Sequence, residues 1–379
     1  MTSQSSPSPE KPIGNAGRFA AALRILEEAI AARAFPGCAL GVLAGDEVVL
    51  QGALGRFTYE ENAPAVAAET VFDVASLTKV VATTAAAMLL VQRGQLELET
   101  PLVDLLPGFV VGRPPGDLAS TVQLQHLLAH NSGLPGYVEF FRTATTPSAL
   151  MRACLDLPLQ AAPATRAEYS DPGFILGGKA LEVLTREDLA IWTHREIFQP
   201  LGMAATGFCP SPVTRPSIPP TEEDMTFRHR RIQGEVEDEN ASVLNGVAGH
   251  AGLFSNVPDL LRFARAILRS AKPASPNENP SLFDPAVLER FAQRQPPVGS
   301  SRALGWDTPS QPSSSGKHFA RHSIGHLGYS GCSLWIDLDA AIAVVLLTNR
   351  TWPDRQNQSI KEVRTLFHDA VRESLQDNF

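Results

Sequence analysis

The sequence predicts a mixed α/β protein in which an antiparallel sheet is flanked by the two terminal helices and a mostly helical lobe is inserted between them. Apolar residues recur at spacings of three and four near both ends of the chain, at Phe19, Leu23, Leu26 and Ile30 and at Ile360, Val363, Phe367, Val371 and Leu375. These spacings are typical of helices that bury one face. The Phe35-Pro36-Gly37 sequence is expected to end the first of these helices.

Two pairs of strands are expected to form the sheet. Residues 38–44 (CALGVLA) and 47–53 (EVVLQGA) are joined at Gly45-Asp46, a combination that favours a tight hairpin. Residues 333–349 (SLWIDLDAAIAVVLLTN) have the pattern of two further antiparallel strands. The two ends of the chain can therefore share one sheet.

This order of elements predicts a discontinuous domain organisation. Residues 16–75 and 301–379 are expected to form one α/β lobe, and residues 76–300 a mostly helical lobe, with the active site in the cleft between them. Residues 1–15 are polar and rich in Pro and Ser, so we expect a disordered N-terminal tail.

Composition narrows the function classes. The chain has 379 residues, of which 44% are apolar and 19% charged, as in an ordinary soluble globular protein. Its net charge of −8 argues against a nucleic-acid partner and against binding to anionic membranes. The four cysteines lack the C-x-x-C spacing of a zinc site, so we expect buried free thiols at Cys38, Cys154, Cys209 and Cys332.

The N-terminus carries no recognisable targeting signal. Its first residues, MTSQSSPSPEKPIGN, lack the basic stretch and apolar core of a signal peptide. The longest apolar segment, 80–91, is too short to span a bilayer. We therefore expect a cytoplasmic protein without a membrane span, and an upstream start codon would make a periplasmic location the expectation instead.

The segment 76–79, Ser-Leu-Thr-Lys, carries the main chemical signal. A hydroxyl is a poor nucleophile at neutral pH, so an acyl-transfer enzyme needs a base within hydrogen-bond reach of it. Residues i and i+3 of a helix share one face, which sets Ser76 beside the amine of Lys79. The sequence from Ser76 to Gly94 is rich in Ala and Leu and free of Pro, so it predicts a helix that starts at the serine.

Two downstream segments give this short motif its context. Tyr169-Ser170-Asp171 has a structural interpretation, a capped turn before a buried helix, and a functional one, in which the Tyr169 hydroxyl relays a proton beside Ser76. His326-Leu327-Gly328 precedes a strand, where an isolated histidine is more often structural. Small residues beside the strand edge nevertheless allow a substrate backbone to lie close.

With these three motifs the chain resembles the penicillin-recognising serine hydrolases, in the branch of class C β-lactamases, low-molecular-weight D,D-carboxypeptidases and related esterases. The resemblance extends from residue 18 to residue 375. It includes VFDVA at 71–75, HLLAHNSGL at 126–134 and GHAGLFS at 249–255. It implies a β-lactamase/D,D-peptidase-like fold.

The resemblance also implies roles for the motif residues. Ser76 would be the nucleophile, Lys79 the group that accepts its proton, and Tyr169 the second acid/base. The backbone N–H groups of Ser76 and Tyr329 would form the oxyanion hole, and Gly328 would line the substrate strand. The reaction implied is two-step acyl transfer through an acyl-Ser76 intermediate.

Two departures from the family pattern concern the substrate. His326 stands where many members have a lysine, and a neutral imidazole anchors a carboxylate less well than an ammonium. Asp171 stands where asparagine is usual, and a carboxylate near Lys79 would favour its charged form. Either Tyr169 carries more of the base role, or Asp171 faces away from Lys79.

Two other features have competing interpretations. His126 and His130 are four residues apart on an expected helix, a spacing that zinc enzymes use, but no third ligand follows them and the segment fits the family motif. The charged segment 221–240 is most simply a solvated face. A cleft loop is the alternative, which would make Glu239, Asn240 and His250 pocket residues.

We therefore expect a serine hydrolase that acts on a small ester or amide, without a cofactor or metal. A D,D-carboxypeptidase or weak β-lactamase is the alternative within the family, with a cell-wall-derived peptide as substrate. A non-catalytic ligand-binding protein of the same fold is the alternative of another class, disfavoured because Ser76, Lys79 and Tyr169 are all intact.

Overall fold

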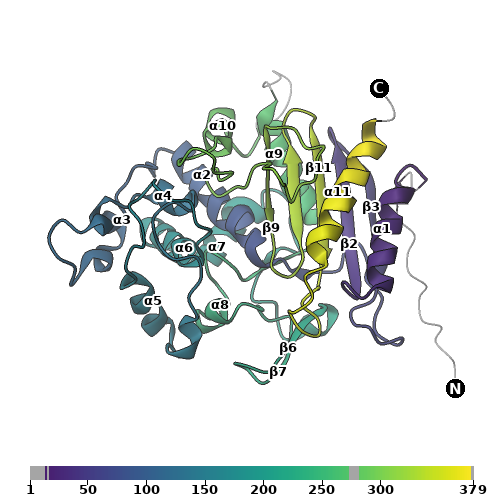
Figure 1. Ribbon diagram of the computed structural model, residues 1–379, viewed down its shortest axis with the longest axis horizontal. Helices are drawn as coiled ribbons and strands as arrows, with labels where there is room; N and C mark the ends of the chain where they lie inside the picture. Colours follow the sequence, from purple (N-terminus) through teal and green to yellow (C-terminus); the bar gives the residue numbers. More distant parts are fainter. Residues whose placement is uncertain (1–12, 15–16, 273–280, 377–379) are drawn as a thin grey trace.

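The computed structural model describes residues 13–14, 17–272 and 281–376. A six-stranded sheet, in the order β1-β3-β2-β11-β10-β9, forms the first of two lobes (Figure 1). All neighbouring strands are antiparallel, with these bounds: β1 Ile13–Gly14, β2 Gly37–Ala44, β3 Glu47–Gly55, β9 Ser323–Leu327, β10 Ser333–Asp337 and β11 Ile342–Thr348. The predicted fold class and both predicted strand pairs are confirmed.

Within the predicted N-terminal tail, Ile13 and Gly14 pair with β3 as the edge strand β1. Residues 1–12 and 15 of the predicted tail lie outside the described residues.

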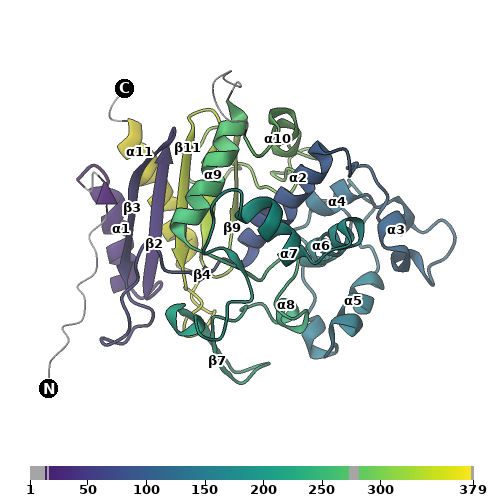
Figure 2. The same cartoon turned by 180° about the vertical axis from the view of Figure 1, so that it is seen from behind.

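Helices cover both faces of the sheet. The terminal helices α1 (Ala20–Ala31) and α11 (Ile360–Gln376) lie side by side on one face, and α9 (Val257–Ala271) covers the other (Figures 1 and 2). The apolar stripes predicted for the terminal helices form a core with β2, β3, β10 and β11. Because β2 and β11 lie in the middle of the sheet, their side chains are buried on both faces.

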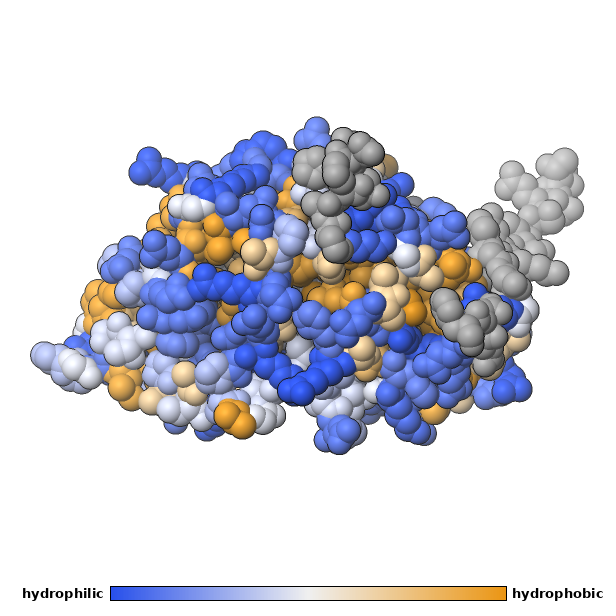
Figure 3. All heavy atoms as spheres, turned by 90° about the horizontal axis from the view of Figure 1, so that it is seen from above, coloured by the Kyte–Doolittle hydropathy of each residue, from blue (hydrophilic) through white to orange (hydrophobic). Residues whose placement is uncertain are grey.

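The second lobe consists mainly of short helices. Its elements are α2 Ala85–Gln92, α3 Leu102–Leu105, α4 Leu124–Leu128, α5 Pro147–Leu155, α6 Asp171–Thr185, α7 Leu189–Thr193, α8 Glu239–Val243 and α10 Pro285–Ala292, with the strands β4 Phe72–Asp73, β5 Gly207–Phe208, β6 Pro220–Asp224, β7 Arg230–Gln233 and β8 Leu253–Ser255. The longest of these helices, α6, begins directly after the Tyr169-Ser170 segment. Seen from above, hydrophilic residues cover much of the protein, with smaller apolar areas between them (Figure 3).

The helix predicted from Ser76 is one continuous helical stretch with three kinds of turn. A 3₁₀ turn at Ala75–Leu77 leads into a π-helical segment, Lys79–Thr84, and then into α2. Gly94, in the left-handed conformation at φ 65°, follows its end as predicted. The stretch Ala75–Gln92 is long and apolar enough to cross a membrane, but 83% of it is buried inside the protein, as expected of a core helix.

The cysteine prediction holds in part. All four cysteines are free thiols, and Cys38, Cys154 and Cys332 are buried. Cys209 is exposed, so the prediction of burial is wrong there. The reason is its position just after the short strand β5, at the surface of the second lobe.

A close contact between two glycines joins α6 to the segment behind the helix of Ser76. A Cβ at Gly178 would lie 2.7 Å from the Cα of Gly249, a distance that real side chains do not reach. The carbonyl oxygen of Gly249 in turn accepts a hydrogen bond of 2.7 Å from Thr83. Glycine at position 178 therefore sets the distance between α6 and the helix that carries Lys79.

This contact predicts opposite effects for two neighbouring substitutions in α6. We expect Gly178→Ala to lower the free energy of unfolding by about 1–3 kcal/mol, because backbone atoms must move apart. Gly177→Ala should raise it by about 0.5–1 kcal/mol, because a Cβ there meets no atom within 4 Å and alanine favours the helix. Urea unfolding of both variants measures the difference, and equal effects would contradict the proposed contact.

Candidate active site

A cavity of about 780 Å³ opens between the two lobes and contains all but one of the predicted site residues. Its lining includes Ser76, Tyr169, Asp171, His326, Gly328 and Tyr329. The remaining predicted residue, Lys79, is fully buried beneath Ser76. The three sequence motifs, which are far apart in the chain, therefore meet at one place.

Ser76 lies in the first turn of the helical stretch, with Lys79 one turn further on. Lys79 Nζ donates a hydrogen bond of 2.8 Å to Ser76 Oγ. Ala75 precedes the serine with a φ of 47°, a left-handed conformation that alanine rarely adopts. Such local strain persists only where the surroundings hold it, and it is common at active sites.

Lys79 is held by a carboxylate and a backbone carbonyl. Its Nζ lies 2.7 Å from Asp171 Oδ1 and donates a hydrogen bond of 3.1 Å to the carbonyl oxygen of His250. Burial alone would lower the pKa of Lys79, but the charge of Asp171 and the proximity of Tyr169 outweigh it and raise the pKa above its usual value. Asp171 therefore faces Lys79, and the lysine at rest is an ammonium ion.

Tyr169 completes this group. Its hydroxyl is within hydrogen-bonding reach of Lys79 and Ser76, and Lys79 Nζ lies 4.8 Å from the centre of its ring. Burial raises the pKa of Tyr169, while the nearby ammonium acts in the opposite direction. Tyr169 and Lys79 thus both hold their protons in the resting site.

His326 lies beside Tyr169, with ring centres 5.8 Å apart, and is a neutral imidazole as predicted. Its Nδ1 lies 2.8 Å from the carbonyl oxygen of Leu327, so Nδ1 carries the proton. Burial, together with the charges of Lys79 and Arg302, places the pKa of His326 well below its usual value. Its buried Nε2 has no hydrogen-bond partner among the described residues and remains an acceptor.

The surroundings of Gly328 leave no room for a side chain, which explains why the third motif ends in glycine. A Cβ at this position would lie 2.6 Å from the carbonyl oxygen of Val74, two residues before Ser76. The Ser330 hydroxyl reinforces this approach by donating a hydrogen bond of 2.8 Å to the carbonyl oxygen of Asp73. The two backbone segments expected to form the oxyanion hole, at Ser76 and Tyr329, are thereby held together.

Asp73 supports the site and was not singled out from the sequence. Its carboxylate accepts hydrogen bonds from the backbone N–H groups of Ala75, at 2.8 Å, and Glu237, at 2.7 Å. Burial raises the pKa of Asp73 to about 6, although both hydrogen bonds act against this. An aspartate just before a predicted helix start is the available signal, because such residues bond to free N–H groups.

The predicted helical pair of His126 and His130 is wrong. Helix α4 ends at Leu128, and His130 follows it in the left-handed conformation, at φ 54°. The His126 Nδ1 instead accepts a hydrogen bond of 3.0 Å from the backbone N–H of Gln123. No group of three potential metal ligands lies together in the part of the chain that the structure describes.

His130 accepts hydrogen bonds from the residues before and after Tyr169 in the chain. Its Nδ1 accepts a hydrogen bond of 2.9 Å from the N–H of Ser170, and its carbonyl oxygen accepts one of 2.8 Å from the N–H of Glu168. Its ring also packs against the Tyr169 ring, with centres 4.6 Å apart. Sequence reasoning assigned His130 only to a structural motif.

The interpretation of 221–240 as a solvated face is wrong for several of its carboxylates. Glu222, Glu237 and Glu239 are buried and all contact the guanidinium of Arg355, at distances up to 3.1 Å. Glu237 and Glu239 line the cavity, which supports the alternative interpretation as a cleft loop. Their common partner, Arg355, comes from a distant part of the chain, and local sequence cannot reveal it.

The other two pocket candidates lie behind the cavity wall. Asn240 Nδ2 donates a hydrogen bond of 2.8 Å to the carbonyl oxygen of Val138, and its Oδ1 accepts one from Phe141. The His250 ring lies 3.0 Å from Asp238. Both side chains therefore support the cavity rather than line it.

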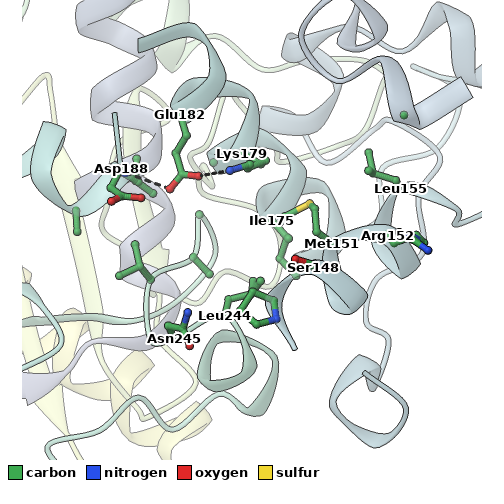
Figure 4. A pocket seen from close by; sticks show the side chains of 18 of the residues that line it. Ser148, Met151, Arg152, Leu155, Ile175, Lys179, Glu182, Asp188, Leu244 and Asn245 are labelled. Carbon is green, nitrogen blue, oxygen red and sulfur yellow. Dashed lines mark hydrogen bonds and ion pairs between the residues drawn. The ribbon is translucent and has the colours of Figure 1, made fainter. Parts of the chain in front are cut away.

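A second cavity, of about 840 Å³, lies between α5, α6 and α7 (Figure 4). It is lined by Met151, Ile175 and Leu244, and by the ion pair of Lys179 with Glu182 at 3.0 Å. None of the predicted catalytic residues lines it. Of these two cavities, the one at Ser76 is the candidate active site.

Comparison with known proteins agrees with this geometry. The family model described as Beta-lactamase matches residues 23–367. The chain belongs to the β-lactamase family. It is also 30% identical over 359 residues to an N-acetylmuramyl-L-alanine amidase of Bacillus subtilis, an alignment that covers 86% of this chain and 80% of the amidase.

Solved structures of β-lactamase-like proteins share the fold. EstCE1, a hydrolase with promiscuous acyltransferase activity, matches with a TM-score of 0.74 and 21% identity over 94% of this chain and 99% of its own. A penicillin-binding protein homologue from Caulobacter crescentus matches with a TM-score of 0.75 and 16% identity over 96% and 100%. At these identities the likeness establishes the fold, and the substrate has to be argued from the site.

The His130 contacts predict a kinetic effect. We expect His130→Ala to lower kcat about 10- to 100-fold with little change in KM, because the Ser170 N–H loses its acceptor and Tyr169 loses its support. His130→Asn should recover most of the loss, because asparagine offers an acceptor and tolerates a positive φ. His126→Ala, which removes a similar backbone contact away from Tyr169, is the control. A His130→Ala variant with wild-type kcat would contradict this role.

Proposed function

We propose that this serine hydrolase of the β-lactamase family cleaves small esters or amides through an acyl-Ser76 intermediate. The observation that carries the proposal is the hydrogen bond of 2.8 Å between Lys79 Nζ and Ser76 Oγ, at the floor of the cavity between the lobes. A nucleophile within reach of a proton acceptor, at the start of a helix, is the arrangement that acyl transfer requires.

In the first step, Ser76 Oγ attacks the acyl carbon and the bond to the leaving oxygen or nitrogen breaks. The serine proton passes through the Lys79–Tyr169 pair to the leaving atom, which departs as an alcohol or amine. In the second step, water attacks the acyl carbon, the bond to Ser76 Oγ breaks and the acyl group leaves as a carboxylic acid, while a proton of the water returns to Ser76 Oγ through the same pair. The backbone N–H groups of Ser76 and Tyr329 are proposed to stabilise the charge on the acyl oxygen.

The resting charges bear on which group acts as the base. Because the pKa values of Lys79 and Tyr169 are both raised, the pair must lose one proton before it accepts another from Ser76. Groups this close titrate together, so the active form is a Lys79–Tyr169 pair that shares the remaining proton. Asp171 contacts Lys79 at 2.7 Å and therefore sets the pH at which this form appears.

The substrate class rests on the site and on the relatives. The EstCE1 neighbour is a hydrolase with acyltransferase activity, and the Bacillus subtilis relative is named an amidase. Esters and amides share one acyl-enzyme route, and the shape of the pocket decides between them. The proposed chemistry uses Ser76, Lys79 and Tyr169 and calls for no cofactor.

The serine assignment predicts the loss of a covalent reaction. We expect Ser76→Ala to abolish labelling by a fluorophosphonate probe and to lower the hydrolysis of p-nitrophenyl butyrate by about a millionfold, as removal of a nucleophile does elsewhere. Ser132→Ala is the control and should label normally, because it changes another buried serine, whose hydroxyl accepts a hydrogen bond from the Leu134 N–H in its own loop. Wild-type labelling of the Ser76→Ala protein would rule out the assignment.

The Asp171 contact predicts a shift in pH dependence. Asp171 raises the pKa of Lys79, so Asp171→Asn should lower it and generate the active form at lower pH. We expect the acidic limb of the kcat/KM profile to move to lower pH in this variant. Glu168→Gln changes a cavity carboxylate that pairs with Arg166 instead and should leave the limb in place. An unshifted or upward-shifted limb in Asp171→Asn would contradict the proposed pair.

A further inference from the structure

Asp238 and His250 form a polar pair at the wall of the active-site cavity, which Asp238 lines. Asp238 Oδ1 lies 3.0 Å from His250 Nε2. The other ring nitrogen of His250, Nδ1, is buried and has no hydrogen-bond partner among the described residues. An imidazolium would leave a buried N–H without an acceptor there, so the surroundings favour a neutral ring that donates from Nε2. Asp238 is therefore the polar anchor of the His250 side chain.

The backbone of His250 reaches Lys79. Its carbonyl oxygen accepts a hydrogen bond of 3.1 Å from Lys79 Nζ, and the preceding carbonyl oxygen, that of Gly249, accepts one of 2.7 Å from Thr83. Thr83 lies one turn after Lys79 in the same π-helical segment. Two consecutive carbonyl groups thus bind the helix that carries the lysine. A shift of this backbone would change the direction of Lys79 Nζ relative to Ser76.

Asp238 is itself held in place by its neighbours in the chain. Its Oδ1 also accepts a hydrogen bond of 2.7 Å from the Ala241 N–H, as the N-cap of α8. The preceding residue, Glu237, donates its N–H to Asp73 at 2.7 Å, and the Asp73 carboxylate also accepts the N–H of Ala75. The segment that carries Asp238 therefore supports the backbone just before the nucleophile as well as the lysine.

Asp238 also brings a negative charge close to Lys79. Burial raises the pKa of Asp238, but the contact with His250, the hydrogen bond from Ala241 and the ammonium of Lys79 outweigh it and lower the pKa to about 2. The carboxylate is therefore ionised throughout the neutral pH range. Because the attraction is mutual, a carboxylate that is favoured by the ammonium also favours the ammonium. Asp238 thus acts on Lys79 in the same direction as Asp171.

Several titratable groups face the two charges. Asp171 and Tyr169 contact Lys79, and its charge also acts on the pKa values of His130, His326 and Asp238. Asp238 in turn faces His250, Tyr137, Glu239 and Asp73. The pKa values of His130 and His326 lie well below their usual range, so both rings are neutral. Of the groups near the ammonium, the two carboxylates therefore supply the negative charge.

We propose that Asp238 is a positioning residue for the acyl transfer. Through His250 it holds the carbonyl group that fixes Lys79 beside Ser76, and its charge adds to that of Asp171 in keeping the lysine an ammonium at rest. The proposal rests on the proposed function, in which the Lys79–Tyr169 pair transfers the serine proton.

Asp238→Asn separates the charge from the hydrogen bonds. Both bonds of the side chain end on Oδ1, an oxygen that asparagine also has, and asparagine is an equally good helix N-cap. We expect the maximal kcat for p-nitrophenyl butyrate to stay within about fivefold of wild type. The acidic limb of the kcat/KM profile should move to lower pH by about 0.5–1 unit, because the ammonium loses a neighbouring charge. An unshifted limb would overturn the proposal.

Asp238→Ala removes the anchor of His250 as well as the charge. We expect it to lower kcat about 10- to 100-fold with KM nearly unchanged, and to slow fluorophosphonate labelling by a similar factor. Asp284→Ala is the matched control, because Asp284 caps α10 by accepting the Ala286 N–H at 2.8 Å and does not line the active-site cavity. A wild-type kcat in Asp238→Ala, or an equal loss in the control, would contradict the positioning role.

The wild-type protein separates failure of this proposal from failure of the proposed function. If it neither hydrolyses p-nitrophenyl butyrate nor reacts with the fluorophosphonate probe, the proposed function is wrong and the role of Asp238 with it. If it does both, and the Asp238 variants change neither kcat nor the acidic limb, the Asp238 proposal alone is wrong. Because Asp238→Asn retains both hydrogen bonds, its pH profile gives this answer even if Asp238→Ala does not fold.

Discussion

The candidate active site depends on the contact between a buried ammonium, that of Lys79, and the carboxylate of Asp171, 2.7 Å apart. A lysine without exposed surface would lose its proton or destabilise the fold if no opposite charge accompanied it. The asparagine usual at this position would supply an oxygen but no charge. Asp171 keeps the ammonium in place beside Ser76, and it also raises the pKa of Lys79, the group that releases a proton before reaction in the proposed mechanism.

Close contacts between backbone segments fix the distance between Lys79 and Asp171. Gly178 brings α6, which begins at Asp171, against Gly249, and the next carbonyl, that of His250, accepts a hydrogen bond from Lys79. Gly328 brings the third motif against Val74 in the same way. In both places glycine is required because the neighbour is backbone, which has no rotamer to change.

The fold could be predicted because the sequence patterns that indicate its helices and strands are local. The stripe from Phe19 to Ile30 and the hairpin at Gly45 follow from spacing and turn chemistry, and the structure has both. The burial of Glu222 and Glu239 could not be predicted, because it depends on Arg355, more than a hundred residues further along the chain. The prediction that His126 and His130 share a helix failed for the same reason, because His130 lies outside the helix and makes a tertiary contact to Ser170.

Three basic side chains, those of Lys79, Arg302 and His326, lie around the Tyr169 ring, and two of them affect the charge of the third. Lys79 Nζ and the Arg302 guanidinium lie 4.8 Å and 5.2 Å from the centre of the ring, and burial together with these two cations holds the pKa of His326 well below its usual value. A lysine in place of His326 would bring a third cation close to these two, and like charges at such distances disfavour ionisation. The neutral ring at position 326 therefore lies near Tyr169 together with the Arg302 guanidinium, without a third positive charge beside them.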